Sequence, residues 1–182
     1  LLYNKDLLQR SAVQYHWINT NYESFEHYLS SMTSRKRKMI KKERRHILDQ
    51  NIHVEILDGT QISHSMWNFF YQLYERTYAK RNGTRGYLTS QFFTEIAQTM
   101  PEQIVMSVAT KNSQPIACAL YLFDDDTLYG RYWGSIGDYQ FLHFELCYYQ
   151  GIEFAIKKGL GRYDAGAQGE QKLVRGFQPV KT

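Results

Sequence analysis

The hydrophobic positions of the chain change their period near residue 100. Before that point, apolar side chains mostly recur every three or four positions, which is typical of one buried face of a helix. After it, short runs alternate between apolar and polar residues and end at turn residues, which is typical of strands. The pattern therefore predicts a chain that is mainly helical first and mainly β-sheet afterwards.

Capping residues set the ends of the predicted helices. Ser, Thr, Asn and Asp favour the position just before a helix because their side chains accept hydrogen bonds from its first free N–H groups. The predicted helices are 21–48 after Asn21 or Ser24, about 63–80, 90–99 after Thr89 or Ser90, and 142–158 ending at Gly159. Residues 168–175 add a helical turn.

Strands are predicted wherever an alternating run ends at a turn. They are 52–57, 103–110, 115–123, 127–133 and 162–165, and residues 12–18 form either an edge strand or an ordered arm. The three strands between 103 and 133 are joined by turns of a few residues, so they are expected to pair as an antiparallel meander. The predicted fold class is α+β, a mostly antiparallel mixed sheet flanked by helices.

Positive charge is concentrated near the beginning of the chain. Residues 1–50 carry 10 Lys and Arg against 5 Asp and Glu, whereas the rest of the chain carries 12 against 13. Most of the excess lies in the run Arg35–Arg45, which is either a phosphate-binding surface or a solvated helix face. Because Met39, Ile40 and Ile47 already give this helix a buried stripe, we expect a solvated face and no nucleic acid.

Composition and spacing exclude several classes of protein. A hydrophobic content of 43% supports a folded core. No apolar run approaches the ~18 residues that a membrane span needs, and no histidines have metal-ligand spacing, so we expect neither a span nor a bound metal. Cys118 and Cys147 lie in apolar surroundings and are expected as buried thiols, which favours a reducing cytoplasm.

The chain begins without Met and starts in the middle of a pattern. We therefore expect part of a longer protein, in which residues 1–20 are an N-terminal arm or the remnant of a preceding unit. Residues 21–182 are expected to form one domain that is truncated at its C-terminus.

Ionisable residues of the last third gather at the ends of predicted elements, beside glycines, where a scaffold normally places a functional site. A carboxylate or a neutral imidazole can accept a proton from a substrate. The candidates for that catalytic role are Glu170, His143, Glu145 and Asp164. Each also has a structural interpretation as a cap, a core residue or a turn residue. An imidazole near a helix N-terminus is expected to be neutral near pH 7.

Long motifs follow one another in a characteristic order from about residue 15 to 182. They are Ser34–Lys38 with Lys42–Arg45, Tyr87-Leu88 with Phe92-Phe93, Gly130–Gly134, His143–Gly151, and Gly166–Glu170 with Lys172–Pro179. In these motifs the chain resembles the GNAT superfamily of acyl-CoA N-acyltransferases. More closely it resembles the bacterial FemAB-like branch, often called peptidoglycan biosynthesis proteins. The resemblance implies a GNAT-like fold and the C-terminal one of two such units.

The resemblance also implies where an acyl donor would lie. In this fold the donor sits where the third strand of the meander parts from its neighbour, and that junction holds Arg131, Trp133 and Gly134. The residues themselves suggest further contacts for an anionic donor or acceptor at Gln168 in the Gly-rich loop, and at Lys172 and Arg175, which are three apart on one helical face. Gln171 stands where the family usually has His, which is a departure from the family pattern.

The residues and the resemblance together predict a cytoplasmic N-acyltransferase. An acyl or aminoacyl group would pass from acyl-CoA as co-substrate, or from tRNA, to a small-molecule or peptide amine. The attack would be direct, since neither cysteine resembles an activated nucleophile. Two alternatives stay open. One is a non-catalytic GNAT-like module that binds a ligand or partner, and the other is an aminoacyl-tRNA-dependent ligase of cell-wall peptides.

Overall fold

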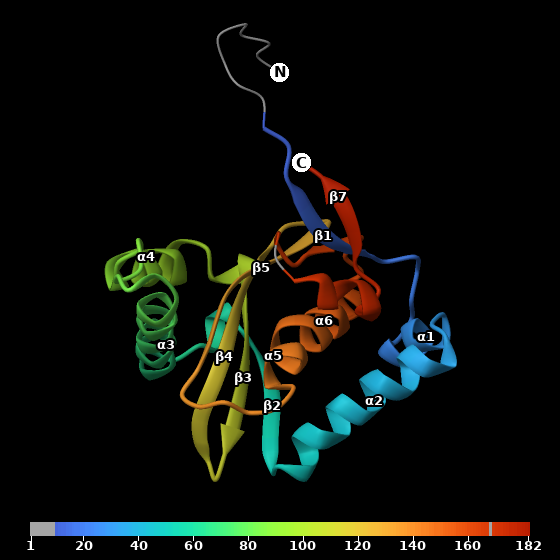
Figure 1. Cartoon of the computed structure of the whole chain (residues 1–182). Helices are drawn as coiled ribbons and strands as arrows, with labels where there is room; N and C mark the ends of the chain where they lie inside the picture. The colour runs from blue at the N-terminus through green and yellow to red at the C-terminus, as the bar shows by residue number, and fades with distance from the viewer. Residues whose placement is uncertain (1–9, 168) are drawn as a thin grey trace, which may run out of the picture.

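The computed structural model describes residues 10–167 and 169–182, in which one mixed sheet has helices on both faces (Figure 1). The strand order is β2-β3-β4-β5-β6-β1-β7, and neighbours are antiparallel except for the parallel pair β5 and β6. The strands are β1 Val13–Ile18, β2 Ile52–Asp58, β3 Ile104–Lys111, β4 Gln114–Phe123, β5 Thr127–Ser135, β6 Arg162–Asp164 and β7 Gln178–Lys181. The predicted α+β class and its mostly antiparallel sheet are confirmed.

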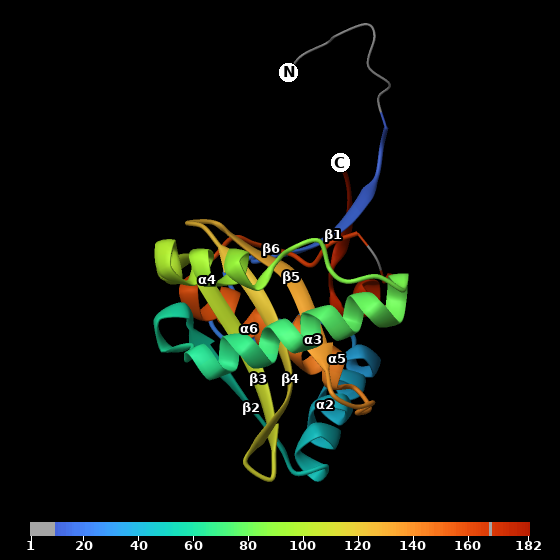
Figure 2. The same ribbon diagram turned by 90° about the vertical axis from the view of Figure 1, so that its left-hand side faces the viewer.

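The helices form a layer on each face of the sheet. α3 and α4 cover one face, and α1, α2 and the continuous helix of α5 and α6 cover the other (Figure 2). The helices are α1 Phe25–Ser30, α2 Ser34–Asp49, α3 His64–Asn82, α4 Ser90–Thr99, α5 Leu142–Phe144 and α6 Gln150–Lys158. Short 3₁₀ turns cover Gly59–Gln61, Pro101–Gln103 and Glu170–Arg175, and the last is called the 170–175 turn below. Among the described residues, no helix is long and apolar enough to cross a membrane.

The two layers enclose two hydrophobic cores that share the central strands. Because successive residues of a strand point to opposite faces, β3 contributes to both cores. Ile104, Met106 and Val108 pack with α3 and α4, whereas Val105 and Ala109 pack with the other layer. Burial on both faces explains why this strand is almost continuously apolar.

The helix predicted over 21–48 is wrong as a single element. Ser24 caps α1 as predicted, accepting a hydrogen bond from the N–H of His27 at 3.1 Å, but α1 ends at Ser30. Thr33 then caps α2 by accepting from the N–H of Lys36 at 3.4 Å. Hydroxyls that bond to the nearby backbone compete with the helix ladder, so one apolar stripe is divided between two helices.

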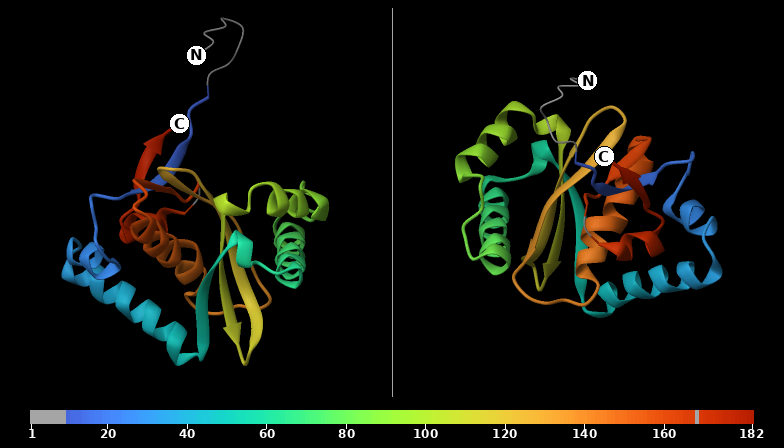
Figure 3. Two further views of the ribbon diagram at one scale, coloured as in Figure 1. Left: turned by 180° about the vertical axis from the view of Figure 1, so that it is seen from behind. Right: turned by 45° about the horizontal axis from the view of Figure 1, so that its top comes forward.

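The first described strand lies inside the sheet. β1 pairs with β6 on one side and with β7 on the other, so it is not the edge strand that its sequence suggested (Figure 3). The four residues of β7, near the other end of the chain, supply the outer edge. Segments far apart in the sequence are therefore neighbours beside β6.

A glycine lets α3 approach β5 closely. A Cβ added at Gly134 would lie 2.7 Å from the Cβ of Leu73 and 2.9 Å from its carbonyl oxygen. The carbonyl belongs to the helix backbone and cannot rotate away. The resemblance implied a donor contact for Gly134, whereas the structure places this residue against α3.

We expect the substitution Gly134→Ala to destabilise the fold, because the new methyl group must push α3 away from the sheet. The free energy of unfolding should fall by ~1–3 kcal/mol, as measured by urea denaturation. Gly137→Ala is the matched control, since the nearest atom to a Cβ there is a side-chain carbon of Tyr139 at 3.3 Å. Its effect should stay within ~0.5 kcal/mol. Equal losses in the two variants would contradict this account of Gly134.

Candidate functional site

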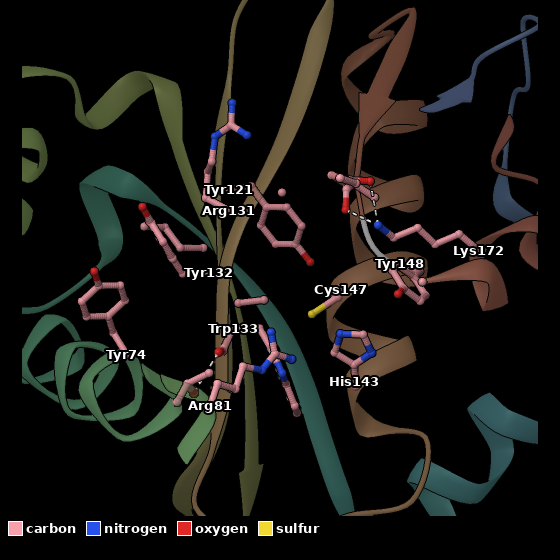
Figure 4. A pocket seen from close by; sticks show the side chains of 18 of the residues that line it. Tyr74, Arg81, Tyr121, Arg131, Tyr132, Trp133, His143, Cys147, Tyr148 and Lys172 are labelled. Atoms are coloured by element: carbon pink, nitrogen blue, oxygen red, sulfur yellow. Dashed lines mark hydrogen bonds between the residues drawn. The ribbon is translucent and has the colours of Figure 1, made fainter. Parts of the chain in front are cut away.

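The sheet opens between β5 and β6, and a cavity of about 710 Å³ lies at the opening (Figure 4). The two strands pair only over 127–129 and 162–164. β5 then continues to Ser135 without β6 beside it. Residues of α3 and β4, the helix of α5 and α6 and the chain after β6 complete the walls. The opening lies at the position where the resemblance placed the acyl donor.

Gly130 and a β-bulge mark the point where the strands part. A Cβ at Gly130 would lie 3.0 Å from the hydroxyl oxygen of Tyr163, so glycine allows β5 to pass this ring. The register of the β4–β5 ladder shifts between Leu120 and Tyr121, which leaves Arg131 as the extra residue. A bulge bends its strand and removes one residue from the regular ladder. Arg131 therefore stands outside the ladder at the edge of the cavity.

The helix opposite β5 contains a π-helical turn over Glu145–Tyr149. Such turns are rare in proteins overall, and those that occur often lie at functional sites. The carbonyl of Leu146 accepts a hydrogen bond from the hydroxyl of Tyr121. The carbonyl of Cys147 accepts one from the hydroxyl of Tyr163. Buried strand tyrosines thus hold the irregular turn against the sheet, a feature that the predicted regular helix over 142–158 lacked.

Lys172 places a buried ammonium group at the cavity wall. The residue is 3% exposed, and its Nζ donates hydrogen bonds to the carbonyls of Ala165 at 2.5 Å and Gly166 at 2.9 Å (Figure 4). Burial lowers the pKa of this amine to about 8, and the nearby carboxylate of Asp164 only partly opposes the effect. The side chain is fixed by backbone carbonyls, so its position depends on how the 170–175 turn is held.

His143 brings a neutral imidazole to the same cavity. Its ring lies 5.0 Å from that of Trp133 and 5.2 Å from that of Tyr148, measured between centroids. Burial, followed by the positive charge of Arg81, lowers the pKa of His143 to about 4. The sequence predicted a neutral imidazole from its place near a helix N-terminus, whereas the main cause in the structure is burial.

The cavity is positively charged. Arg81 reaches it from α3, Arg131 from β5 and Lys172 from the 170–175 turn. Among the residues that the structure describes, no Asp or Glu lines it. A concave surface lined by one sign of charge concentrates ligands of the opposite sign, so the cavity fits an anion. No three His, Cys, Asp or Glu side chains within 10–167 and 169–182 gather as a metal site.

Four of the ten predicted site residues line the cavity, namely His143, Arg131, Trp133 and Lys172. Arg175 is instead paired with Glu43 at 2.7 Å beneath the 170–175 turn. Gly134 packs against α3, as described above. Gln168 lies outside the described residues.

Three of the predicted carboxylates lie outside the cavity lining. Glu145 is buried and its carboxylate is bound by the guanidinium of Arg44 from α2 at 2.9 Å. Asp164 accepts a hydrogen bond from the N–H of Gly166 at 2.8 Å, which is a turn-forming contact. Glu170 is exposed at the start of the 170–175 turn. Of the four predicted bases, His143 alone lines the cavity.

Sequence reasoning missed the contribution of α3. Tyr74, Tyr78 and Arg81 follow one another at spacings of four and three, and all three line the cavity. Aromatic residues at such spacing normally belong to a core, so the spacing by itself does not indicate a site. Arg81, a charged residue that continues the helical face of Tyr74 and Tyr78, is the local signal that points to a site. Cys147 also lines the cavity, and burial raises the pKa of its thiol far above the usual value.

Comparison with known proteins gives both a family and a set of similar folds. The model of the FemAB-like family, described as peptidoglycan biosynthesis/recognition, matches residues 1–182. No curated protein matches the chain. The crystal structure of FemX superposes with a TM-score of 0.66 at 14% identity, over 97% of this chain and 61% of its own.

Two further solved structures have the same fold. L-PGS from Bacillus licheniformis superposes with a TM-score of 0.63 at 10% identity, over 94% of this chain and 59% of its own. The C-terminal domain of a putative lysylphosphatidylglycerol synthetase from Agrobacterium fabrum gives 0.58 at 11%, over 87% and 48%. This chain therefore spans less than two thirds of each structure. The likeness confirms the predicted GNAT-like α+β fold.

We expect the Lys172 amine to titrate near pH 8 instead of its usual 10.5. Between these values the unfolded chain binds more protons than the folded one, so stability rises as the pH increases from 8 to 10.5. The size of the rise is about 3 kcal/mol. NMR of ¹³C-labelled lysine should show one resonance with a midpoint near 8, and Lys172→Met should remove both this resonance and the rise. A midpoint above 10 would contradict the burial of the amine.

Proposed function

Because the chain belongs to the FemAB-like family, we propose that it is the transferase domain of an enzyme that joins an aminoacyl group to an amine of a cell-wall peptide. The description of the family, peptidoglycan biosynthesis/recognition, supports this ligase better than the acyl-CoA-dependent enzyme that the sequence led us to expect. The proposed donor is an aminoacyl ester of tRNA, and acyl-CoA is the competing donor.

The observation that carries the proposal is the charge of the cavity at the opened sheet. It is lined by Arg81, Arg131 and Lys172 and by no described carboxylate. An RNA or CoA donor carries phosphates, and a cell-wall peptide carries carboxylates, so both partners of the reaction are anionic. The three cations attract such groups more strongly in a partly buried cavity than they would in bulk water.

The proposed reaction is direct attack of the acceptor amine on the ester carbonyl carbon. A C–N bond forms, the carbonyl oxygen becomes negatively charged, and the C–O bond to the carrier then breaks. The proton lost by the nitrogen ends on the leaving oxygen, so the products are an amide and a free carrier hydroxyl. Lys172 is proposed to stabilise the oxyanion, because a fixed cation acts most strongly where negative charge develops.

His143 is proposed to orient the acceptor amine. A neutral imidazole offers one ring nitrogen as a hydrogen-bond acceptor, and the pKa of about 4 keeps that nitrogen free of a proton at neutral pH. The same low pKa makes His143 a weak base, so transfer of the proton to the leaving oxygen fits the cavity better than storage on the imidazole.

We expect the full-length protein to form an amide between an aminoacyl group and a peptidoglycan-precursor peptide when supplied with aminoacyl-tRNA. Lys172→Met should lower kcat by about 10²–10³-fold, the usual effect of losing an oxyanion-stabilising group. Mass spectrometry of the peptide product measures the transfer. Turnover with acyl-CoA alone would support the competing donor, and stabilisation by a donor without turnover would support a binding module.

The placement of the predicted bases leads to a second expectation. His143→Phe should lower kcat by about 10–100-fold, since the amine loses its acceptor in the cavity while an aromatic ring is kept. Glu170→Gln should change kcat by less than ~2-fold, because Glu170 is exposed and does not line the cavity. The two variants serve as controls for each other under identical assay conditions. A large loss of activity in Glu170→Gln together with normal activity in His143→Phe would reverse the assignment.

A further inference from the structure

An ion pair between Glu43 and Arg175 is buried beneath the 170–175 turn. The two side chains belong to α2 and to the end of the turn, and their residues are 6% and 3% exposed. Nη2 of Arg175 lies 2.7 Å from Oε1 and 2.8 Å from Oε2 of Glu43. None of the reacting groups proposed above touches this pair, so the mechanism leaves it unexplained.

Arg175 joins three separate elements. Its Nε donates a hydrogen bond to the hydroxyl of Tyr149 in the π-helical turn at 2.8 Å, and its Nη1 donates to the carbonyl of Gln171 at 2.8 Å. The hydroxyl of Tyr149 also contacts the Glu43 carboxylate. The guanidinium lies 3.6 Å from the centre of the Phe144 ring. One side chain therefore ties α2, the α5–α6 helix and the 170–175 turn together.

The peptide carbonyl that Arg175 holds belongs to the residue directly before Lys172. The turn is also closed by hydrogen bonds from the N–H of Lys172 to the carbonyl of Gly169 at 3.0 Å and from the N–H of Phe177 to the carbonyl of Lys172 at 3.2 Å. Any change in how Arg175 holds Gln171 therefore shifts the backbone from which the Lys172 ammonium reaches the cavity.

Stability alone is a weak reason for such a pair. Two buried charges lose their hydration, and replacing them with apolar side chains of similar volume is often neutral or stabilising. An ion pair fixes the relative orientation of its two side chains more narrowly than an apolar contact does, because a planar guanidinium binds a carboxylate in few orientations. The position of the pair next to the cavity makes geometry the property that matters.

We infer that Glu43 and Arg175 are positioning residues that hold the Lys172 ammonium at the cavity. The inference rests on the proposed role of Lys172 in transfer and assigns to α2 a part in building the site. It also assigns separate roles to two neighbouring residues of α2. Glu43 serves the 170–175 turn, whereas the neighbouring Arg44 binds Glu145 at 2.9 Å and Glu153 at 2.8 Å on the α5–α6 helix.

The test compares Glu43→Gln and Tyr149→Phe with the control Glu153→Gln in the full-length protein. Glu43→Gln removes the charge with little change of shape, and Tyr149→Phe removes only the hydroxyl between Glu43 and Arg175. Glu153→Gln weakens the ion pair between Glu153 and Arg44 of α2, which does not reach the 170–175 turn. Arg44 keeps its ion pair with Glu145 in this variant. Circular dichroism and melting temperature verify that each variant is folded.

The first measurement is the NMR titration of Lys172, which needs no substrate. In Glu43→Gln its midpoint should move from about 8 toward the ordinary 10.5 by at least ~1 pH unit, because a loosened turn exposes the amine to water. Tyr149→Phe should move it in the same direction by less. Glu153→Gln should leave it in place.

The second measurement is steady-state transfer. Glu43→Gln should lower kcat by about 10–100-fold with KM within ~3-fold, since the missing interaction acts in the transition state. An unmoved Lys172 midpoint in both test variants overturns the inference, even where stability or activity falls. If the wild-type protein transfers no aminoacyl group, the proposed function fails while the titration still decides the positioning role. If Glu43→Gln does not fold, Tyr149→Phe decides it.

Discussion

The early parting of β5 from β6 is the constraint on which the rest of the structure depends. β6 has three residues, and β5 bends away at Gly130 and at the bulge that leaves Arg131 outside the ladder. Beyond that point β5 has no strand on its β6 side to fill the space. α3 and the α5–α6 helix therefore form the walls of this space. A cavity therefore forms at a place where an ordinary sheet would continue its packed core.

Charge is divided between two environments around this opening. Cations face the cavity, whereas Glu43 of α2 and Glu145 of the π-helical turn are buried and bound by arginines. Glu145 is held by Arg44, and Glu43 by Arg175. A buried carboxylate with such a partner is satisfied and adds no negative charge to the cavity. These two carboxylates therefore stay out of the cavity lining, where the described charged side chains are the cations Arg81, Arg131 and Lys172.

Local features were predictable from the sequence, and long-range ones were not. Caps at Ser24 and Thr89, the meander and the helix after it follow from patterns within a few residues. The partner of Glu145 stands 101 positions away, and no local pattern identifies it. The same limit applies to the aromatic residues of α3, because their spacing alone is equally typical of a buried core. His143 and Lys172 could be predicted as site residues because they lie at the ends of predicted elements, in a part of the chain with several glycines, and this pattern is visible within a few residues.

The place of β1 between β6 and β7 also bears on how the protein folds. β6 borders the cavity and pairs with Thr127–Tyr129 on one side and His16–Ile18 on the other, and β1 pairs in turn with Gln178–Lys181. The contacts of β1 with β6 and β7 join residues more than 140 positions apart, and such high contact order slows folding. β7, which follows all the other described strands in the sequence, forms the outer edge beside β1. β1 can therefore pair with both of its neighbours only after the chain has been synthesised as far as Lys181.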